Sequence, residues 1–192
     1  MNNSKAIVFD AYGTLFDVNS AAEKSKDKIG NKWENFANFW RTTQLEYTWL
    51  RSLMKKHKNF WQITEDSLDK SMETFQIDKS LRNDLLSLYK KLSPYPEVKN
   101  VLENLKKKSF KLAILSNGTP ELLNHLVKSS DLENLFDDIF SVEEVKIYKP
   151  DPKVYDIPVN KYKLSEGEIT FLSANTWDVS GAGNYGYNSI WV

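Results

Sequence analysis

A short apolar run near the N-terminus ends in a carboxylate that is followed by a glycine-containing turn. Residues 6–9 read Ala-Ile-Val-Phe, Asp10 comes next, and Gly13 follows in the same segment. A run this short, apolar throughout and rich in strand-forming residues is typical of a strand buried on both faces of a parallel sheet. Asp10 then lies at the carboxyl end of that strand, where open α/β sheets bind ligands. We expect Asp10 to be a nucleophile or a metal ligand, the alternative being a helix N-cap.

Other segments of the chain repeat this apolar pattern, and helical patterns lie between them. That alternation predicts strand-helix-strand units, and hence an α/β fold with a parallel sheet flanked by helices. The further strands are expected at residues 111–117, 138–142, 169–173 and 188–192.

The region between the first two strands has a different character. Apolar side chains recur at helical spacing from Trp33 to Lys56, and shorter helical patterns cover residues 65–75 and 79–92. The prolines of Ser93-Pro-Tyr-Pro96 favour an extended return to the sheet. We therefore expect residues 18–96 to form an all-helical cap inserted into a core made of residues 1–17 and 97–192. Such a lid over the sheet edge would exclude water from a crevice.

Composition excludes several classes of function. The 192 residues contain 26 Lys and Arg against 26 Asp and Glu, so the chain lacks the basic field of a dedicated nucleic-acid binder. It has no cysteine, which excludes disulfides, thiolate nucleophiles and Cys-ligated zinc. No apolar stretch reaches membrane-spanning length, and the N-terminus lacks the apolar region of a signal peptide. We expect a cytoplasmic protein without nucleic-acid or membrane partners.

Two basic runs and two histidines have simpler interpretations. The runs at residues 55–58 and 106–108 are short enough to be solvated faces. His57 and His125 show neither metal-ligand nor triad spacing, so we interpret both as surface or packing residues.

Polar clusters also follow the later expected strands. Ser116-Asn-Gly118 precedes a helix that opens at Thr119-Pro120, and free N–H groups there suit an anion. Lys149 stands before a rigid Pro-Asp-Pro turn, where it brings a positive charge to the crevice or is simply a surface lysine. Asp178 ends the cluster after the strand at 169–173 and either activates a water or caps a helix.

These clusters resemble the motifs of the haloacid dehalogenase superfamily, and within it the type II (S)-2-haloacid dehalogenases. Tyr12 stands where the superfamily usually carries the second aspartate of Asp-x-Asp, and the Ser173-Ala-Asn175 stretch lacks the acid of the Mg²⁺-dependent phosphatases. The resemblance therefore implies a metal-independent enzyme without a cofactor. The matching segments are Asp-Ala-Tyr-Gly-Thr at 10–14, Ser-Asn-Gly at 116–118, Tyr-Lys-Pro at 148–150, Ser-x-Asn-x-Trp-Asp at 173–178, and the cap segments 40–41, 44–47 and 59–61.

The resemblance implies hydrolysis of small (S)-2-haloacids to (R)-2-hydroxyacids through an ester on Asp10. It gives Lys149 and Asp178 the roles of stabilising that ester and activating water. The other implied catalytic residues are Thr14, Arg41, Tyr155, Ser173 and Asn175. The implied substrate-binding residues are Ala11, Tyr12, Arg41, Leu45, Phe60, Ser116, Asn117 and Trp177, and no residue is assigned to a metal.

Three departures and two alternatives accompany this prediction. The family usually continues beyond the position of Val192. Pro158 is expected to break or weaken its helix and so to disturb the placement of Tyr155. Thr42 stands beside Arg41 where related enzymes often carry a longer polar side chain. The alternatives are a Mg²⁺-dependent phosphatase and a shortened, weakly active relative that serves as a binding or oligomeric protein. The aromatic cap also suits a homodimer interface.

Overall fold

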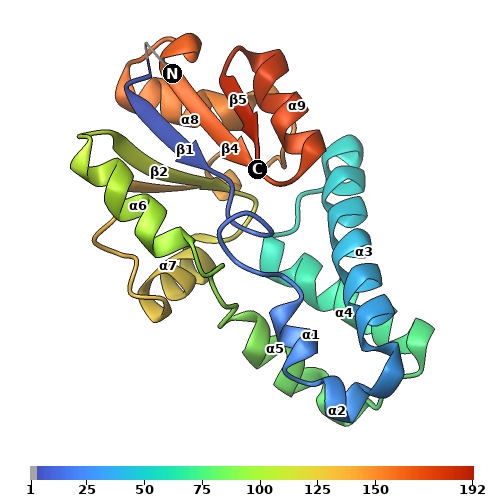
Figure 1. The fold of residues 1–192 in the computed structure, drawn as a ribbon. Coiled ribbons are helices and arrows are strands. Elements are labelled where there is room, and N and C mark those ends of the chain that lie inside the picture. The colour runs from blue at the N-terminus through green and yellow to red at the C-terminus, as the bar shows by residue number, and fades with distance from the viewer. Residues whose placement is uncertain (1–3) are drawn as a thin grey trace.

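The computed structural model describes residues 4–192, which form a parallel sheet with helices on both faces and a helical insert. The strand order within the described part of the chain is β3-β2-β1-β4-β5, with every neighbouring pair parallel (Figure 1). This confirms the predicted α/β fold, and no predicted strand end is displaced by more than one residue. The strands are β1 (Ala6–Phe9), β2 (Lys111–Ser116), β3 (Asp138–Ser141), β4 (Ile169–Ser173) and β5 (Asn188–Trp191).

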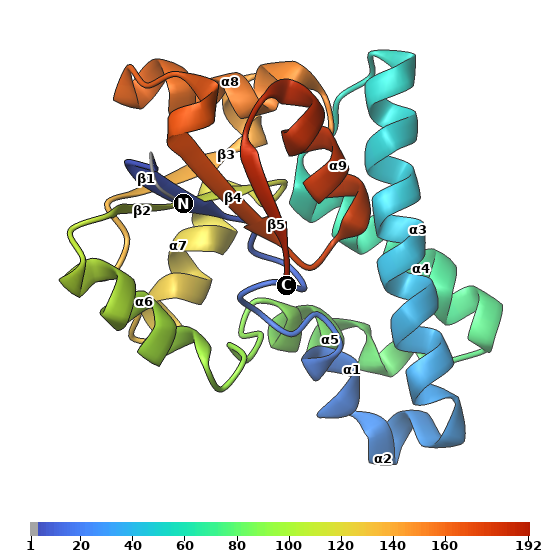
Figure 2. The ribbon, with the colours of Figure 1, turned by 45° about the horizontal axis from the view of Figure 1, so that its top comes forward.

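Four helices cover the sheet. Figure 2 shows α6 (Val98–Lys107) and α7 (Pro120–Ser129) on one face, with α8 (Pro152–Tyr162) and α9 (Thr176–Tyr185) on the other. Since both faces are covered, β1 is buried along its whole length, as its continuous apolar sequence predicts. Within residues 4–192, four short 3₁₀ segments occur at residues 30–32, 79–81, 142–144 and 166–168.

The predicted break in the helix at Pro158 does not occur. Helix α8 runs from Pro152 to Tyr162 with Pro158 inside it. A proline in a helix interior removes one backbone hydrogen bond, but burial of apolar side chains can offset that cost. Pro158 is itself buried beside Ile157 and Tyr155, so packing against the core retains the helix.

Five helices fill the insert between β1 and β2. The long helix predicted from the spacing of apolar residues is confirmed as α3, whereas α4 begins at Phe60, earlier than the predicted residue 65. A capping box causes this earlier start, because Asn59 accepts the N–H of Gln62 and the Gln62 side chain accepts the N–H of Asn59. The helices are α1 (Ser20–Glu23), α2 (Lys26–Ile29), α3 (Trp33–Met54), α4 (Phe60–Phe75) and α5 (Arg82–Tyr89).

The strand register brings the polar clusters to one edge of the sheet. Phe9 of β1 lies beside Ile114 of β2 on one side and Leu172 of β4 on the other, so the ends of the three strands lie within two residues of one another. Helix α3 of the insert runs past this edge beside α9 in both ribbon views (Figures 1 and 2). No helix within residues 4–192 is both long and apolar enough to cross a membrane.

Candidate active site

Asp10 lies at the centre of the polar cluster, and each of its carboxylate oxygens is hydrogen-bonded. Oδ1 accepts from Lys149 Nζ at 3.1 Å. Oδ2 accepts from Asn175 Nδ2 at 2.8 Å, Thr14 Oγ1 at 3.0 Å and Ser173 Oγ at 3.3 Å. The backbone N–H of Ala174 in turn donates to Thr14 Oγ1 at 3.0 Å, which fixes that hydroxyl. Asp10 is therefore held by side chains rather than serving as a helix cap.

Lys149 lies between two carboxylates. Its Nζ is 3.1 Å from Asp10 Oδ1 and 2.8 Å from Asp178 Oδ2, and its side chain is fully buried. Tyr155 donates its hydroxyl to the other oxygen of Asp178 at 2.7 Å. The ring of Phe171, on β4, lies 4.9 Å below the ammonium and adds a cation–π contact. Asp178, in the first turn of α9, thus binds a cation and does not cap that helix.

The shared ammonium leaves this cluster with one excess negative charge. Burial lowers the pKa of Lys149, but Asp10 and Asp178 more than offset that effect, so the pKa lies above its ordinary value. Burial raises the pKa of Asp178 to about 6, helped by Asp10 and opposed by Lys149. At neutral pH Asp178 is therefore mainly ionised and close enough to its pKa to exchange a proton readily.

Tyr12 occupies a buried aromatic stack beside the loop that follows Asp10. Its ring centroid is 5.1 Å from that of Phe60 at the start of α4 and 5.8 Å from that of Tyr89 in α5. A Cβ at Gly118 would lie 2.8 Å from Tyr12 Cε2 and 3.0 Å from its hydroxyl, so glycine permits this close approach. Burial raises the pKa of Tyr12 well above 10.

Arg41 reaches the same loop from α3. Its Nη2 donates to the carbonyl oxygen of Tyr12 at 3.2 Å, and its Nη1 donates to Gln44 Oε1 at 3.0 Å. Leu45 follows one turn later on the same face of α3 and is half-buried. Asn175 Nδ2 also donates to the Tyr12 carbonyl, at 3.2 Å. The insert and the sheet edge therefore meet at this one backbone oxygen.

The remaining predicted residues surround this centre. Ser116 Oγ accepts the N–H of Gly118 at 3.1 Å, and Asn117 Oδ1 accepts the N–H of Lys149 at 3.1 Å. Ala11 is buried, and its carbonyl oxygen accepts N–H groups within the turn that follows Asp10. Trp177 contacts Trp49 of α3 edge to face at 5.5 Å, so it lies against the insert.

A buried polar network lies behind Arg41 and was not predicted from the sequence. Gln44 accepts from Arg41 and donates to Thr64 Oγ1 at 2.6 Å and to the Tyr89 hydroxyl at 3.0 Å. The spacing of Arg41 and Gln44 by three residues on a helix is the one local signal that could have revealed it.

A second contact between insert and core was also missed. His57 Nε2 lies 2.9 Å from Glu143 Oε2, and the histidine ring stacks on Tyr148 at 5.3 Å. The other Glu143 oxygen accepts the N–H of Phe60 at 3.3 Å. His57 is thus a packing residue that joins the two parts of the chain.

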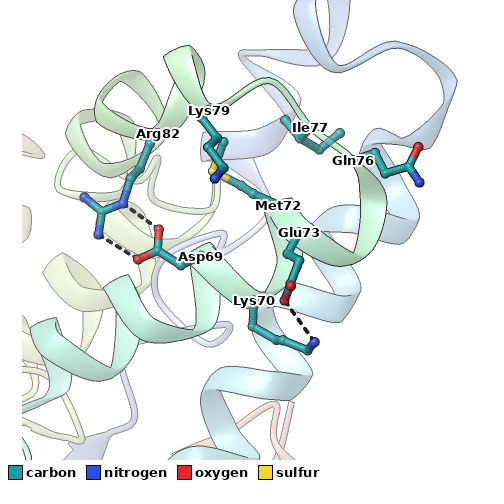
Figure 3. A pocket seen from close by; sticks show the side chains of 8 residues that line it. All are labelled: Asp69, Lys70, Met72, Glu73, Gln76, Ile77, Lys79 and Arg82. Carbon is teal, nitrogen blue, oxygen red and sulfur yellow. Dashed lines mark hydrogen bonds and ion pairs between the residues drawn. The ribbon is translucent and has the colours of Figure 1, made fainter.

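A separate cavity lies away from this cluster. It has a volume of about 800 Å³, and Figure 3 shows its lining side chains at the end of α4 and start of α5, including the Arg82–Asp69 ion pair at 2.5 Å. None of the predicted site residues lines it. Within residues 4–192 no three His, Asp or Glu side chains gather closely enough to hold a metal ion.

The chain is similar to known dehalogenases over nearly its whole length. A family model described as haloacid dehalogenase-like hydrolase matches residues 4–186. The chain is 41% identical to (S)-2-haloacid dehalogenase 4A of Burkholderia cepacia over 99% of this chain and 83% of that protein. It is 43% identical to (S)-2-haloacid dehalogenase 1 of Pseudomonas sp. strain CBS-3, over 99% and 85% of the two chains.

Solved structures agree with these matches. A crystal structure of a dehalogenase superposes with a TM-score of 0.98 at 40% identity, covering 100% of this chain and 86% of the other. The L-2-haloacid dehalogenase from Xanthobacter autotrophicus with chloropropionic acid covalently bound gives 0.91 at 38% identity, covering 98% and 77%. The chain therefore belongs to the family of haloacid dehalogenase-like hydrolases.

Proposed function

We propose that this protein is an (S)-2-haloacid dehalogenase that converts small (S)-2-haloacids and water into (R)-2-hydroxyacids and halide. The observation that carries the proposal is the buried Asp10–Lys149–Asp178 cluster. It supplies a nucleophilic carboxylate, a fixed cation and a second carboxylate with a raised pKa. The identities of 41% and 43% to two (S)-2-haloacid dehalogenases support it independently.

In the first step a carboxylate oxygen of Asp10 attacks C2 of the substrate from the side opposite the halogen. A C–O bond forms, the carbon–halogen bond breaks, and the halide leaves with the bonding electrons, so C2 is inverted. Arg41, Asn117 and Trp177 are the groups that we assign to the departing halide. The Asn117 amide oxygen accepts the N–H of Lys149, which leaves its N–H groups to face the anion.

The substrate carboxylate is assigned to Ser116 and to the N–H groups of Ala11, Tyr12 and Asn117. Ser116 Oγ already accepts the N–H of Gly118, so its hydroxyl proton remains for the ligand. The buried Tyr12 hydroxyl lies beside Gly118 and has no hydrogen-bond partner within residues 4–192, which suits a site that holds a polar ligand. Tyr12 with Leu45, Phe60 and Trp177 would then surround the small side chain of the substrate.

In the second step water attacks the ester carbonyl carbon of Asp10. Asp178 takes a proton from the water and returns it to the ester oxygen as the bond between that oxygen and the carbonyl carbon breaks. The second proton of the water is released to solvent when the Asp10 carboxylate is restored. The hydroxyacid departs with an oxygen that came from Asp10, and the water oxygen replaces it. Tyr155 orients Asp178, while Lys149 and the donors Thr14, Ser173 and Asn175 stabilise negative charge on the Asp10 oxygens.

Chloride release from (S)- and (R)-2-chloropropionate in the presence of EDTA tests this function. We expect release from the (S) form alone, and none from an Asp10→Asn variant. An Asp178→Asn variant that still forms the ester should accumulate a covalent adduct on Asp10, detectable by mass spectrometry of the intact protein. Release that requires Mg²⁺, or none from a folded protein, would contradict the proposal.

The phosphatase alternative has less support. That chemistry needs a general acid where this chain has Tyr12, and the Tyr12 ring is packed between Phe60 and Tyr89. Because burial raises its pKa well above 10, Tyr12 is a poor proton donor to a leaving group at neutral pH. A binding or oligomeric role without catalysis would leave the buried charge cluster unexplained.

The proposal also covers assembly and location. We assign residues 18–96 to the cap and residues 1–17 and 97–192 to the core. We also assign the protein to the cytoplasm. Leu50, Leu53 and Met54 project from α3 with exposed fractions of 50%, 79% and 55%, so we include a homodimer formed through the cap. Sedimentation analysis should give a dimer mass for the natural sequence and a monomer mass for Leu53→Glu, and a monomeric natural sequence would refute this part.

A further inference from the structure

A positively charged cleft lies between the insert and the core. Its volume is about 360 Å³, within the range of small-molecule sites. Arg51 and Lys55, at the end of α3, line it from the insert, while Lys146 and Lys153 line it from the core. His57 completes the wall, and no acidic side chain lines the cleft.

The four cationic side chains are not neutralised by neighbours. Within residues 4–192 none of them forms an ion pair, although the whole chain carries equal numbers of acidic and basic residues. Two acids near them in sequence make other contacts. Glu143 pairs with His57, and Asp151 accepts the N–H of Lys153.

Like charges facing each other across an interface oppose its closure. We propose that the cleft binds a small anion of the phosphate class that carries more than one negative charge and bridges insert and core. Such an anion would neutralise lysines on both sides, with Arg51 able to donate two parallel hydrogen bonds to it.

The cleft is separate from the haloacid site, but contacts of Tyr148 link the two. Tyr148 immediately precedes Lys149, and it contacts the insert twice. Its N–H donates to Ser52 Oγ at 3.1 Å, and its hydroxyl donates to the carbonyl oxygen of Lys58 at 2.6 Å. An anion held between Lys55 and Lys146 would therefore strengthen the same contact that positions the segment carrying Lys149.

Inorganic pyrophosphate is the probe that tests this site, by calorimetric titration of the full chain at low ionic strength. We expect saturable binding at one site and a higher melting temperature than in sodium chloride of equal ionic strength. The double variant Lys55→Gln/Lys146→Gln should bind pyrophosphate at least roughly tenfold more weakly, because one charged contact is lost from each side of the cleft. The matched control Lys107→Gln/Lys108→Gln removes two exposed lysines outside the cleft and should bind like the natural sequence.

Other outcomes overturn the proposal. Absence of saturable binding excludes the site, and equal stabilisation by sodium chloride means simple screening of surface charge. Unchanged binding by the cleft variant, or equal weakening by the control variant, places the anion elsewhere. None of these measurements depends on dehalogenation.

Discussion

Lys149 and Asp178 form a fully buried ion pair, with 2.8 Å between Nζ and Oδ2, in which the lysine is also shared with Asp10. One ammonium cannot neutralise two carboxylates, so the native state retains an unneutralised buried charge. Such an arrangement favours catalysis at the expense of stability, because the burial that raises the pKa of Asp178, helped by the charge of Asp10, also opposes folding.

Asp178→Asn should therefore stabilise the fold while abolishing turnover. The folded pKa of about 6 lies above the value near 3.8 of a free aspartate, so this group's contribution to stability is full below pH 3.8 and is lost as the pH rises through 6. We expect the variant to gain about 1–3 kcal/mol in free energy of unfolding at pH 7. Urea denaturation at several pH values measures it.

The difference between the two proteins should shrink towards pH 4, where Asp178 is protonated and resembles asparagine. A variant less stable at pH 7 than the natural sequence would show that the pair with Lys149 outweighs the excess charge.

Tyr155→Phe should move the pH dependence of activity upward. The tyrosine hydroxyl donates to Asp178 Oδ1 at 2.7 Å and lowers the pKa of that carboxyl, so its removal should raise the pKa further above 6. We expect the acid limb of kcat to shift upward by roughly 1 pH unit, the value of a hydrogen bond to a charged group. Initial rates between pH 4 and 9 measure it.

Tyr162→Phe is the matched control, because Tyr162 lies on the same helix and donates to Asp138 Oδ2 at 2.9 Å, outside the site. Its acid limb should stay in place. If both variants shift equally, the effect belongs to helix α8 rather than to Asp178.

The sequence predicted the strands and the sheet-edge clusters because these depend on local patterns. A buried parallel strand must be apolar throughout, and parallel strands present their carboxyl ends at one edge. Asp10, Ser116 and Ser173 consequently meet at the edge, although more than 100 residues separate the first two along the chain.

Other features depend on contacts that local patterns do not contain. Pro158 stays within α8 because the helix is buried, and Gln44 matters because distant Thr64 and Tyr89 surround it. The contact of His57 with Glu143 joins residues 86 positions apart. The start of α4 at Phe60 is different, since its capping box was visible in the sequence.

Gln44→Leu should reduce activity more than it reduces stability. The leucine removes the acceptor that holds Arg41 Nη1 at 3.0 Å and leaves the guanidinium with only its contact to the Tyr12 carbonyl. We expect kcat/KM for (S)-2-chloropropionate to fall about tenfold, since one hydrogen bond to a charged group is lost. Steady-state kinetics and melting temperatures measure the two effects.

Thr64→Val separates positioning of Arg41 from support of the cap. It removes the hydroxyl that Gln44 Nε2 contacts at 2.6 Å, yet it leaves the bond between Gln44 and Arg41 intact. Its melting temperature should fall while kcat/KM is retained. Equal loss of activity in both variants would mean that the network acts only through stability.

Gly118→Ala should disturb the aromatic wall of the site. The new Cβ would lie 2.8 Å from Tyr12 Cε2 and 3.0 Å from Leu123 Cδ2, which is too close for a packed interior. Relief requires the Tyr12 ring to shift from its place beside Phe60 and Tyr89, so we expect a loss of about 1–3 kcal/mol in stability together with reduced kcat/KM. The double variant Tyr12→Leu/Gly118→Ala should recover part of the lost stability, because leucine has no ring atoms to clash with the new Cβ. Gly167→Ala is the control, because a Cβ added at Gly167 would meet no atom within 4 Å, and it should leave stability and kcat/KM unchanged. Additive effects of the substitutions at positions 12 and 118 would show that the two residues do not press on one another.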